Sequence, residues 1–179
     1  MTWLTRKSFL DTASDLETDL LAQTEDESFG LLLAMLTSDD EEIVKHPLYK
    51  MWTGYEVALA AYEASLAVEL ATRGVYTFKH LESATIIQKL RRTEPAEFEF
   101  PSWLEDIDVL RSHRSNMARR WPSEYAGAWG KTPELWPYLW PFVNSKGGYE
   151  IFVSKQDKNM LISGERQLPK SVRERVQNL

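Results

Sequence analysis

The stretch HPLYKMWTGYEVALAAYEASLAVELATRG, residues 46–74, decides the fold of this chain. Its apolar side chains recur at the spacing of a helix, and Pro47 suits the first position of one. Gly74 supplies a stop signal, and Gly54 marks a kink inside the segment. The stretch therefore predicts a long helix, broken near its start, in the core of a helical protein.

The most apolar part of this stretch, Val57 to Ala71, is interrupted by Glu63 and Glu69. Two carboxylates this close together predict a core helix and not a membrane span. The N-terminus also lacks the basic flank and apolar run of a signal peptide. We therefore expect a cytoplasmic protein with no membrane partner.

Helical periodicity continues on both sides of this segment. Ser8–Gln23 carries its apolar residues on one face, and Ser28 is placed to cap a second, buried helix over FGLLLAML. Trp103–Arg120 is helical again and ends at Trp121-Pro122, because the residue before a proline avoids the helical region. These patterns predict a mainly α fold.

The character of the chain changes after residue 142. The runs YEIFVS (149–154) and NMLIS (159–163) are β-like and flank KQDK, which predicts a hairpin. The final segment, PKSVRERVQNL, predicts a short basic helix. The expected organisation is a compact helical domain over residues 1–142 with a small hairpin-and-helix extension over 143–179.

Composition narrows the classes of protein that this chain can belong to. With 43% hydrophobic and 12% aromatic residues, the chain is globular and not disordered. It has no cysteine, which excludes disulfides and Cys-ligated zinc. The three histidines are far apart, and no phosphate-loop, GxGxxG, HExxH or GxSxG pattern occurs. We expect neither a metal nor a cofactor.

Charge is distributed unevenly along the chain. Residues 1–60 carry 4 Lys and Arg against 12 Asp and Glu, whereas residues 86–179 carry 15 against 12. A net charge of −6 does not suit a sequence-blind binder of duplex DNA, which works through a broad basic surface. Any phosphate site is therefore expected to be local and built by the second half.

The second half contains RSHRSNMARR, residues 111–120, with four arginines and one histidine in ten positions. One interpretation is a solvated helix face whose arginines pair with nearby acids. The other is an anion site, because arginine offers phosphate a planar fork and serine and asparagine add neutral donors. The candidate phosphate-binding or ligand-binding residues are His46, Arg111, His113, Arg114, Asn116, Arg119 and Arg120; His46 is alternatively a helix cap or a core contact.

Aromatic side chains in the same segments have two interpretations as well. They either pack in the core or form a platform on which a nucleic-acid base stacks. The residues concerned are Trp52, Tyr55, Tyr138 and Trp140, with Trp136 considered beside them.

Two blocks of this chain resemble the pyrimidine-dimer DNA glycosylase family, which includes the phage endonuclease V type. The first is HPLYKMWTGYEVAL, similar to the family's H-P-x-x-x-M-W-x-G-Y-x-x-A-L. The second is HRSNMARRWPSEY followed by PYLWP, similar to H-R-S-N-L, Pro-x-x-Tyr and Pro-Tyr-x-Trp-Pro. The resemblance covers about residues 1–142, is specific in these blocks, and implies a compact helical fold from a phage or bacterial DNA-repair protein.

The resemblance implies cleavage of an N-glycosyl bond with a linked lyase step. In the family, the amine exposed by removal of the initiator Met attacks the sugar C1′ and forms a Schiff base. Here that residue is Thr2, which is small enough to permit Met removal. A carboxylate on the first long helix assists, and Asp26 or Glu25 stands at its position.

The first long helix departs from the family pattern R-L-x-K-Q-R-x-E. This chain has DLLAQTED at 19–26, so Asp19 and Ala22 replace cations, as does Thr24 or Glu25. The first hypothesis is a DNA base-excision enzyme, a glycosylase/AP lyase acting on a damaged or modified pyrimidine. The second is a catalytically lapsed relative that binds a nucleotide or modified base without cutting DNA. A third is a protein-interaction module using residues 149–179. The oligomeric state is left open.

Overall fold

The computed structural model describes residues 2–38, 40–76, 79, 82, 85, 86, 88, 99–131, 135–144 and 148–178. By its internal contacts the chain divides into two compact units. The first unit is Met1–Pro101 and the second unit is Ser102–Leu179. The fold is mainly α, as predicted, and each unit is described below by itself.

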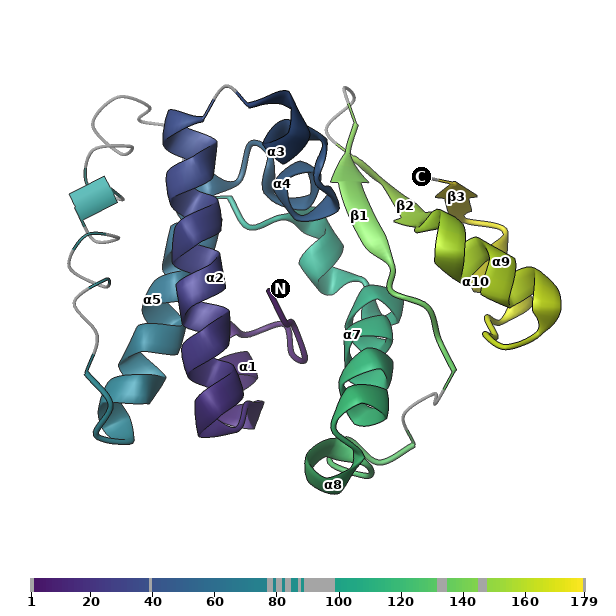
Figure 1. The fold of residues 1–179 in the computed structure, drawn as a ribbon, viewed down its shortest axis with the longest axis horizontal. Helices are drawn as coiled ribbons and strands as arrows, with labels where there is room; N and C mark the ends of the chain where they lie inside the picture. Colours follow the sequence, from purple (N-terminus) through teal and green to yellow (C-terminus); the bar gives the residue numbers. More distant parts are fainter. Residues whose placement is uncertain are drawn as a thin grey trace. The chain divides into compact units, whose positions relative to one another are not determined.

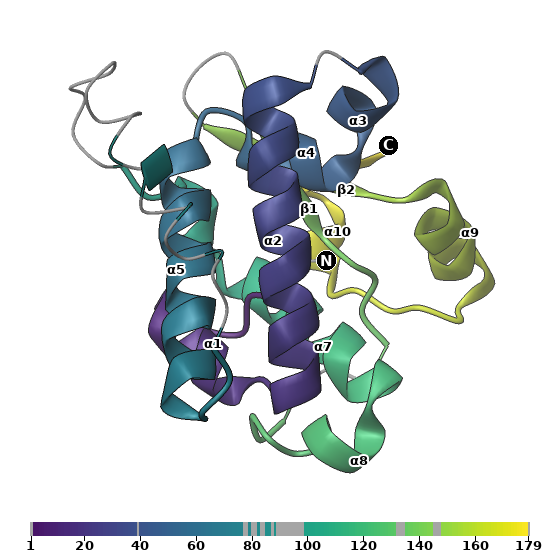
Figure 2. The ribbon, with the colours of Figure 1, turned by 60° about the vertical axis from the view of Figure 1, so that its left-hand side comes forward.

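Helices build the first unit. They are α1 (Phe9–Asp15), α2 (Thr18–Thr37), α3 (Glu41–Lys45), α4 (Pro47–Trp52) and α5 (Glu56–Thr72). The long helices α2 and α5 lie side by side, and α1 packs on α5 (Figure 1). The short helices α3 and α4 lie together near the C-terminal end of α2 (Figure 2). The largest fully buried side chains of this unit include Leu4, Leu16, Leu21, Leu32, Met51, Trp52, Leu59, Tyr62, Leu66 and Leu70.

The segment 46–74 folds as its sequence predicts. Pro47 occupies the first turn of α4, and the chain turns at Gly54, whose φ of 82° lies in the left-handed region that favours glycine. Helix α5 then runs to Thr72 and is followed by Gly74, with φ of 80°. Local backbone rules therefore predict the positions of α4 and α5.

Two expectations for the N-terminal helices are wrong. The single helix expected over Ser8–Gln23 is broken at Leu16 and Glu17, where the chain is extended. Ser28 caps no helix, because α2 runs through it without interruption and its hydroxyl donates to the carbonyl of Thr24 at 2.6 Å. That bond satisfies the serine inside the helix, so its turn-forming tendency is not expressed.

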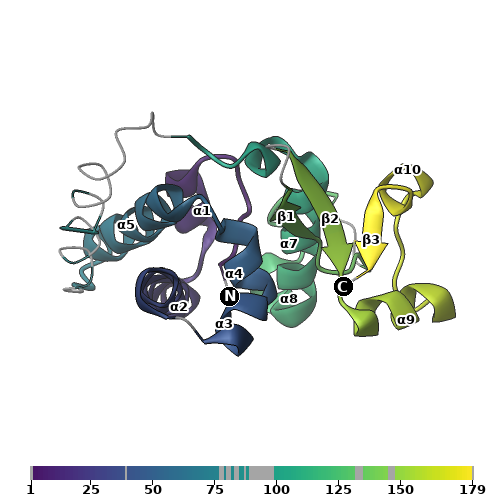
Figure 3. The same cartoon turned by 90° about the horizontal axis from the view of Figure 1, so that it is seen from above.

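The second unit combines short helices with a small sheet. Its elements are η1 (Ser102–Glu105), α7 (Ile107–Arg120), α8 (Pro122–Tyr125), β1 (Trp140–Val143), β2 (Tyr149–Val153), α9 (Lys155–Ser163), α10 (Lys170–Arg173) and β3 (Val176–Asn178). The strand order is β1-β2-β3, with β1 antiparallel and β3 parallel to β2. Figure 3 shows the strands in this order, with α9 and α10 on the β3 side. The end of α7 before Trp121-Pro122 is as predicted.

The hairpin expected around KQDK is wrong. The segment KQDKNMLIS forms α9, which begins after Ser154 and ends at Gly164, whose φ is 84°. The Ser154 side chain accepts from the backbone N–H of Asp157 at 3.0 Å, so a cap begins the helix. The strand over residues 149–153 forms as expected but pairs with β1 and β3.

Residues after 142 are tied to the start of α7. The Tyr149 hydroxyl donates to Asp106 at 2.7 Å, and Arg175 forms ion pairs with Asp106 and with Asp108. Burial raises the pKa of Asp106, but hydrogen bonds from Tyr149 and Arg175 outweigh it and hold that pKa below its ordinary value. The two units divide the chain at residue 101, but they are defined by contacts alone and do not test the domain boundary expected at residue 142, which stays a prediction.

None of the helices described is both long and apolar enough to cross a membrane.

Candidate functional site

The N-terminal segment Thr2–Thr5 lies in the core of the first unit. All four side chains are buried, with at most 2% of their surface exposed. The indole Nε1 of Trp52 donates to the Thr2 hydroxyl at 3.1 Å, and the Tyr62 hydroxyl donates to the carbonyl of Trp3. Chain ends usually fray unless the fold ties them down. Here a side chain of α4 and a side chain of α5 each hold the segment by a hydrogen bond.

The two candidate carboxylates on α2 lie in different environments. Glu25 is buried, with 1% of its side chain exposed, whereas 70% of Asp26 is exposed. The ammonium group of Lys79 contacts both and lies 3.4 Å from Oε2 of Glu25. The hydrogen bond with Asp26 is the main cause that raises the pKa of Lys79. Glu25 is therefore the candidate that reaches the interior.

A second interior carboxylate, Glu63 on α5, was not among the predicted site residues. It is fully buried and directly follows Tyr62, which holds the N-terminal segment. A buried carboxylate is costly unless it is paired, so such residues often mark functional or network positions. The sequence signal for this residue is a glutamate in the middle of the apolar run VALAAYEASLAVEL, residues 57–70.

The remaining candidates of the first unit have structural contacts. His46 caps α4 by accepting from the backbone N–H of Leu48 at 3.2 Å. Burial lowers the pKa of His46. Trp52 is fully buried and stacks on Tyr62 with ring centroids 5.8 Å apart. Tyr55, at the start of α5, is half-buried. Core packing accounts for Trp52, and its role in stacking a base stays a prediction.

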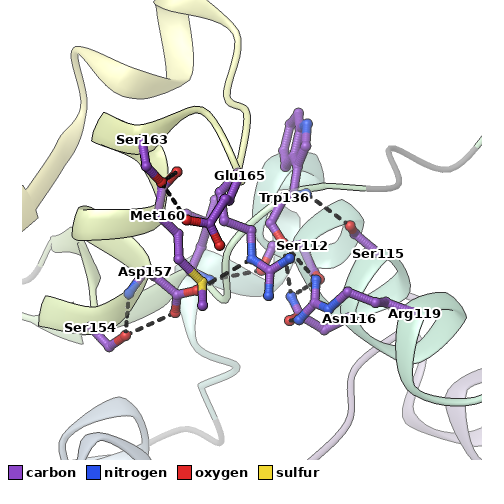
Figure 4. A network of polar contacts seen from close by, with 12 residues as sticks. Ser112, Ser115, Asn116, Arg119, Trp136, Ser154, Asp157, Met160, Ser163 and Glu165 are labelled. Atoms are coloured by element: carbon purple, nitrogen blue, oxygen red, sulfur yellow. Dashed lines mark hydrogen bonds and ion pairs between the residues drawn. The ribbon is translucent and has the colours of Figure 1, made fainter.

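In the second unit, one face of α7 is hydrogen-bonded to the segment 136–139. Figure 4 shows the contacts of Ser115, Asn116 and Arg119 with Trp136. The hydroxyl of Ser115 accepts from the amide N–H of Trp136 at 3.1 Å, and that of Ser112 accepts from the N–H of Leu139 at 2.8 Å. The amide of Asn116 donates to the Ser112 carbonyl at 2.7 Å. The segments Ser112–Asn116 and Trp136–Leu139 are thus held together by direct hydrogen bonds.

His113 lies in the same contact and is fully buried. Its Nδ1 lies 2.8 Å from the Tyr138 hydroxyl, and the two ring centroids are 4.4 Å apart. Burial lowers the pKa of His113 to about 3, so the imidazole is neutral at pH 7. Tyr138 in turn packs against Trp140, and both are buried. The neutral His113 adds no positive charge to the four arginines of the segment 111–120.

The arginines of this helix differ in exposure. Arg111 is half-exposed and forms an ion pair with Asp108 at 3.6 Å. Arg120 is exposed and Arg114 half-buried. Arg119 donates to the carbonyl of Trp136 at 3.3 Å and to the side chain of Asn116.

A cavity of about 700 Å³ opens at the C-terminal half of α7. Arg119 lines it together with Lys131, and α8 and the loop after it supply its other walls. In the part of the chain that the structure describes, no three His, Asp or Glu side chains are grouped as a metal site would require.

The structure brings the sequence candidates together as two sets. Thr2, Glu25, Asp26, His46, Trp52 and Tyr55 belong to the first unit; Arg111, His113, Arg114, Asn116, Arg119, Arg120, Tyr138 and Trp140 belong to the second. Within these sets, direct bonds join Thr2 to Trp52, His113 to Tyr138, and Asn116 to Arg119. No family model, curated protein or solved structure matches this chain.

Proposed function

We propose that this chain is a DNA base-excision protein of the pyrimidine-dimer glycosylase type, acting on a damaged or modified pyrimidine. The observation that supports the proposal is the burial and double anchoring of Thr2–Thr5. A nucleophile must be held in one geometry to react efficiently, and an unanchored chain end cannot supply that. The fixed segment gives the amine of Thr2 a defined place once the initiator Met is removed.

The proposed chemistry begins with that amine. An α-amine has an unperturbed pKa near 8, so a useful fraction is neutral at pH 7. The neutral amine attacks C1′ of the damaged nucleotide, the bond from C1′ to the base breaks, and the departing base takes up a proton. The sugar ring then opens to a Schiff base as the amine loses its remaining proton to O4′. A carboxylate moves these protons, and the burial of Glu25 supports assigning this role to Glu25 and not to the exposed Asp26.

Borohydride trapping tests this mechanism, because reduction converts the Schiff base into a stable amine. Purified protein that has lost Met1, as shown by intact mass, is incubated with a duplex containing an abasic site and with a dimer-containing duplex. We expect a covalent adduct that maps to Thr2. An adduct at a lysine, or no adduct on either duplex, contradicts the proposal.

A pair of variants separates the two carboxylates. Glu25→Gln is expected to slow adduct formation without weakening DNA binding, whereas Asp26→Asn, the matched change at the exposed neighbour, leaves the rate within about twofold. Equal rates for all three proteins would remove Glu25 from the mechanism.

The phosphate contacts of the proposal are assigned to α7. Arg111→Ala together with Arg114→Ala is expected to weaken duplex binding and to flatten its salt dependence, because each lost phosphate contact lowers the slope by about one. Lys170→Ala, at a side chain that is 91% exposed, is the control and should leave the slope unchanged. If the double variant binds DNA as tightly as the parent at the same salt concentration, Arg111 and Arg114 belong to a solvated helix face and do not contact phosphate.

One observation favours the second function, a lapsed relative that binds a nucleotide without cutting DNA. Asp19 is exposed on α2, at the position where the family pattern has a cation. Exposed carboxylates repel a DNA backbone. This alternative predicts a clear thermal shift with a mononucleotide and a shallow salt dependence, whereas tight and strongly salt-sensitive duplex binding contradicts it.

A further inference from the structure

The cavity of the second unit has the composition of a site for a small anion. Its volume of about 700 Å³ lies in the range of small-molecule sites. The walls are mostly apolar, and the charged groups among the described lining residues are two cations. The lining includes Ala118, Pro122, Ala126, Leu135, Arg119 and Lys131.

Arg119 is held in place before any ligand binds. Its guanidinium donates to the Trp136 carbonyl and to Asn116, which uses two of the five N–H groups that an arginine carries. A guanidinium fixed in this way loses little conformational entropy on meeting a carboxylate or phosphate. The cavity therefore has one pre-organised cation in its wall.

The surroundings of Arg119 have an excess of positive charge. Burial lowers the pKa of Arg119, the positive charges of Arg166 and Arg120 lower it further, and the carboxylate of Asp157 opposes them. Asp157 also lies 3.7 Å from Arg166, so one described carboxylate serves two guanidinium groups. An anion in the cavity would relieve this repulsion, and a doubly charged anion would relieve it more than a singly charged one.

Another part of the cavity wall is a defined turn. Gly127 and Gly130 have φ of 94° and 70°, a conformation that side-chain-bearing residues rarely adopt. Between them, the ring of Trp129 stacks on Tyr125 with centroids 5.3 Å apart and planes 4° from parallel. The turn therefore holds its shape by backbone geometry and by ring packing.

From this geometry we propose that the cavity binds a small organic phosphate. Arg119 and Lys131 hold the phosphate, and Ala118, Pro122 and Leu135 contact an apolar body. The inference goes beyond the proposed function, because it requires neither the amine of Thr2 nor duplex DNA.

Titration calorimetry with 1-naphthyl phosphate tests the ligand class. Three partial analogues accompany it: 1-naphthol, inorganic phosphate and 1-naphthoate. We expect saturable binding of 1-naphthyl phosphate. Each analogue should bind about tenfold more weakly or worse, because roughly one charge-assisted contact accounts for a difference of that size. Equal binding of 1-naphthol would make the cavity an apolar site, and equal binding of 1-naphthoate would refute the preference for phosphate.

Matched variants test the place of binding. Lys131→Ala removes a cation and Ala126→Phe fills the cavity, and each is expected to weaken 1-naphthyl phosphate by about tenfold or more. The controls are Lys170→Ala and Ala128→Phe. Ala128 lies two residues after Ala126 in the same turn, and neither control should change the affinity. All four positions are exposed, and unfolding midpoints verify that the variants fold. The proposal is overturned if both test variants bind 1-naphthyl phosphate as the parent does, or if both controls are weakened as much as the test variants. Neither outcome changes the result of borohydride trapping, which tests the proposed function separately.

Discussion

His113 makes the stability of the second unit depend on pH in a way that can be calculated. Its pKa is about 3 in the folded chain and about 6.5 when unfolded. Between these values the unfolded state binds more protons, so stability is fully present above pH 6.5 and falls as the pH drops toward 3. From pH 7 to pH 5 the loss is about 2 kcal/mol.

Urea unfolding followed by tryptophan fluorescence, at pH 7 and pH 5, measures this loss. His113→Asn removes the titrating group, and we expect its stability to drop by about 2 kcal/mol less between the two pH values than that of the parent. Other titrating groups contribute equally to both proteins and cancel. Tyr138→Phe is the control, because it deletes the hydroxyl at 2.8 Å but keeps the imidazole, so it should retain the parent's drop. If His113→Asn loses as much stability as the parent, the buried neutral histidine is refuted.

Three further changes test bonds of the structure. Trp52→Phe removes the donor to the Thr2 hydroxyl and should lower the free energy of unfolding by about 1–2 kcal/mol; a loss below about 0.5 kcal/mol would mean that this bond does not anchor the segment. Burial raises the pKa of Asp106, but the hydrogen bonds from Tyr149 and Arg175 lower it more. The ionised carboxylate therefore stabilises the fold at pH values above the pKa that Asp106 has in the unfolded chain, and this stabilisation is lost on acidification. Thermal unfolding of Asp106→Asn should therefore depend less on pH between about 5 and 3 than that of the parent. Ser115→Ala leaves the amide of Trp136 without its hydroxyl partner and should cost about 1–2 kcal/mol in urea unfolding, and an unchanged midpoint would refute that.

Helix boundaries were predictable wherever a backbone rule acts locally. Pro47 and the glycine at residue 54 placed α4 and its break, because their φ preferences do not depend on the rest of the fold. The helix α9 was missed although its signal was present. Ser154 and Asp157 form a serine-x-x-acid cap before NMLIS, and this cap outweighs the β-like composition of that run.

The candidate site was less predictable, because its contacts join residues far apart in the sequence. The sequence predicts neutral donors for phosphate at the serines 112 and 115, whereas in the structure their hydroxyls accept from amides 27 and 21 residues away. The difference between Glu25 and Asp26 has the same origin. Adjacent residues on a helix face different directions, and only the packing of α2 decides which one is buried.

Burial of Thr2–Thr5 also sets the order in which the first unit can fold. The side chains that anchor Thr2 and Trp3 are 50 and 59 residues further along the chain. At about 5–20 residues per second, roughly 3–12 s of synthesis separate the segment from its partners. The segment Thr2–Thr5 is therefore enclosed only after Trp52 and Tyr62 have been made, and until then it stays open to other molecules.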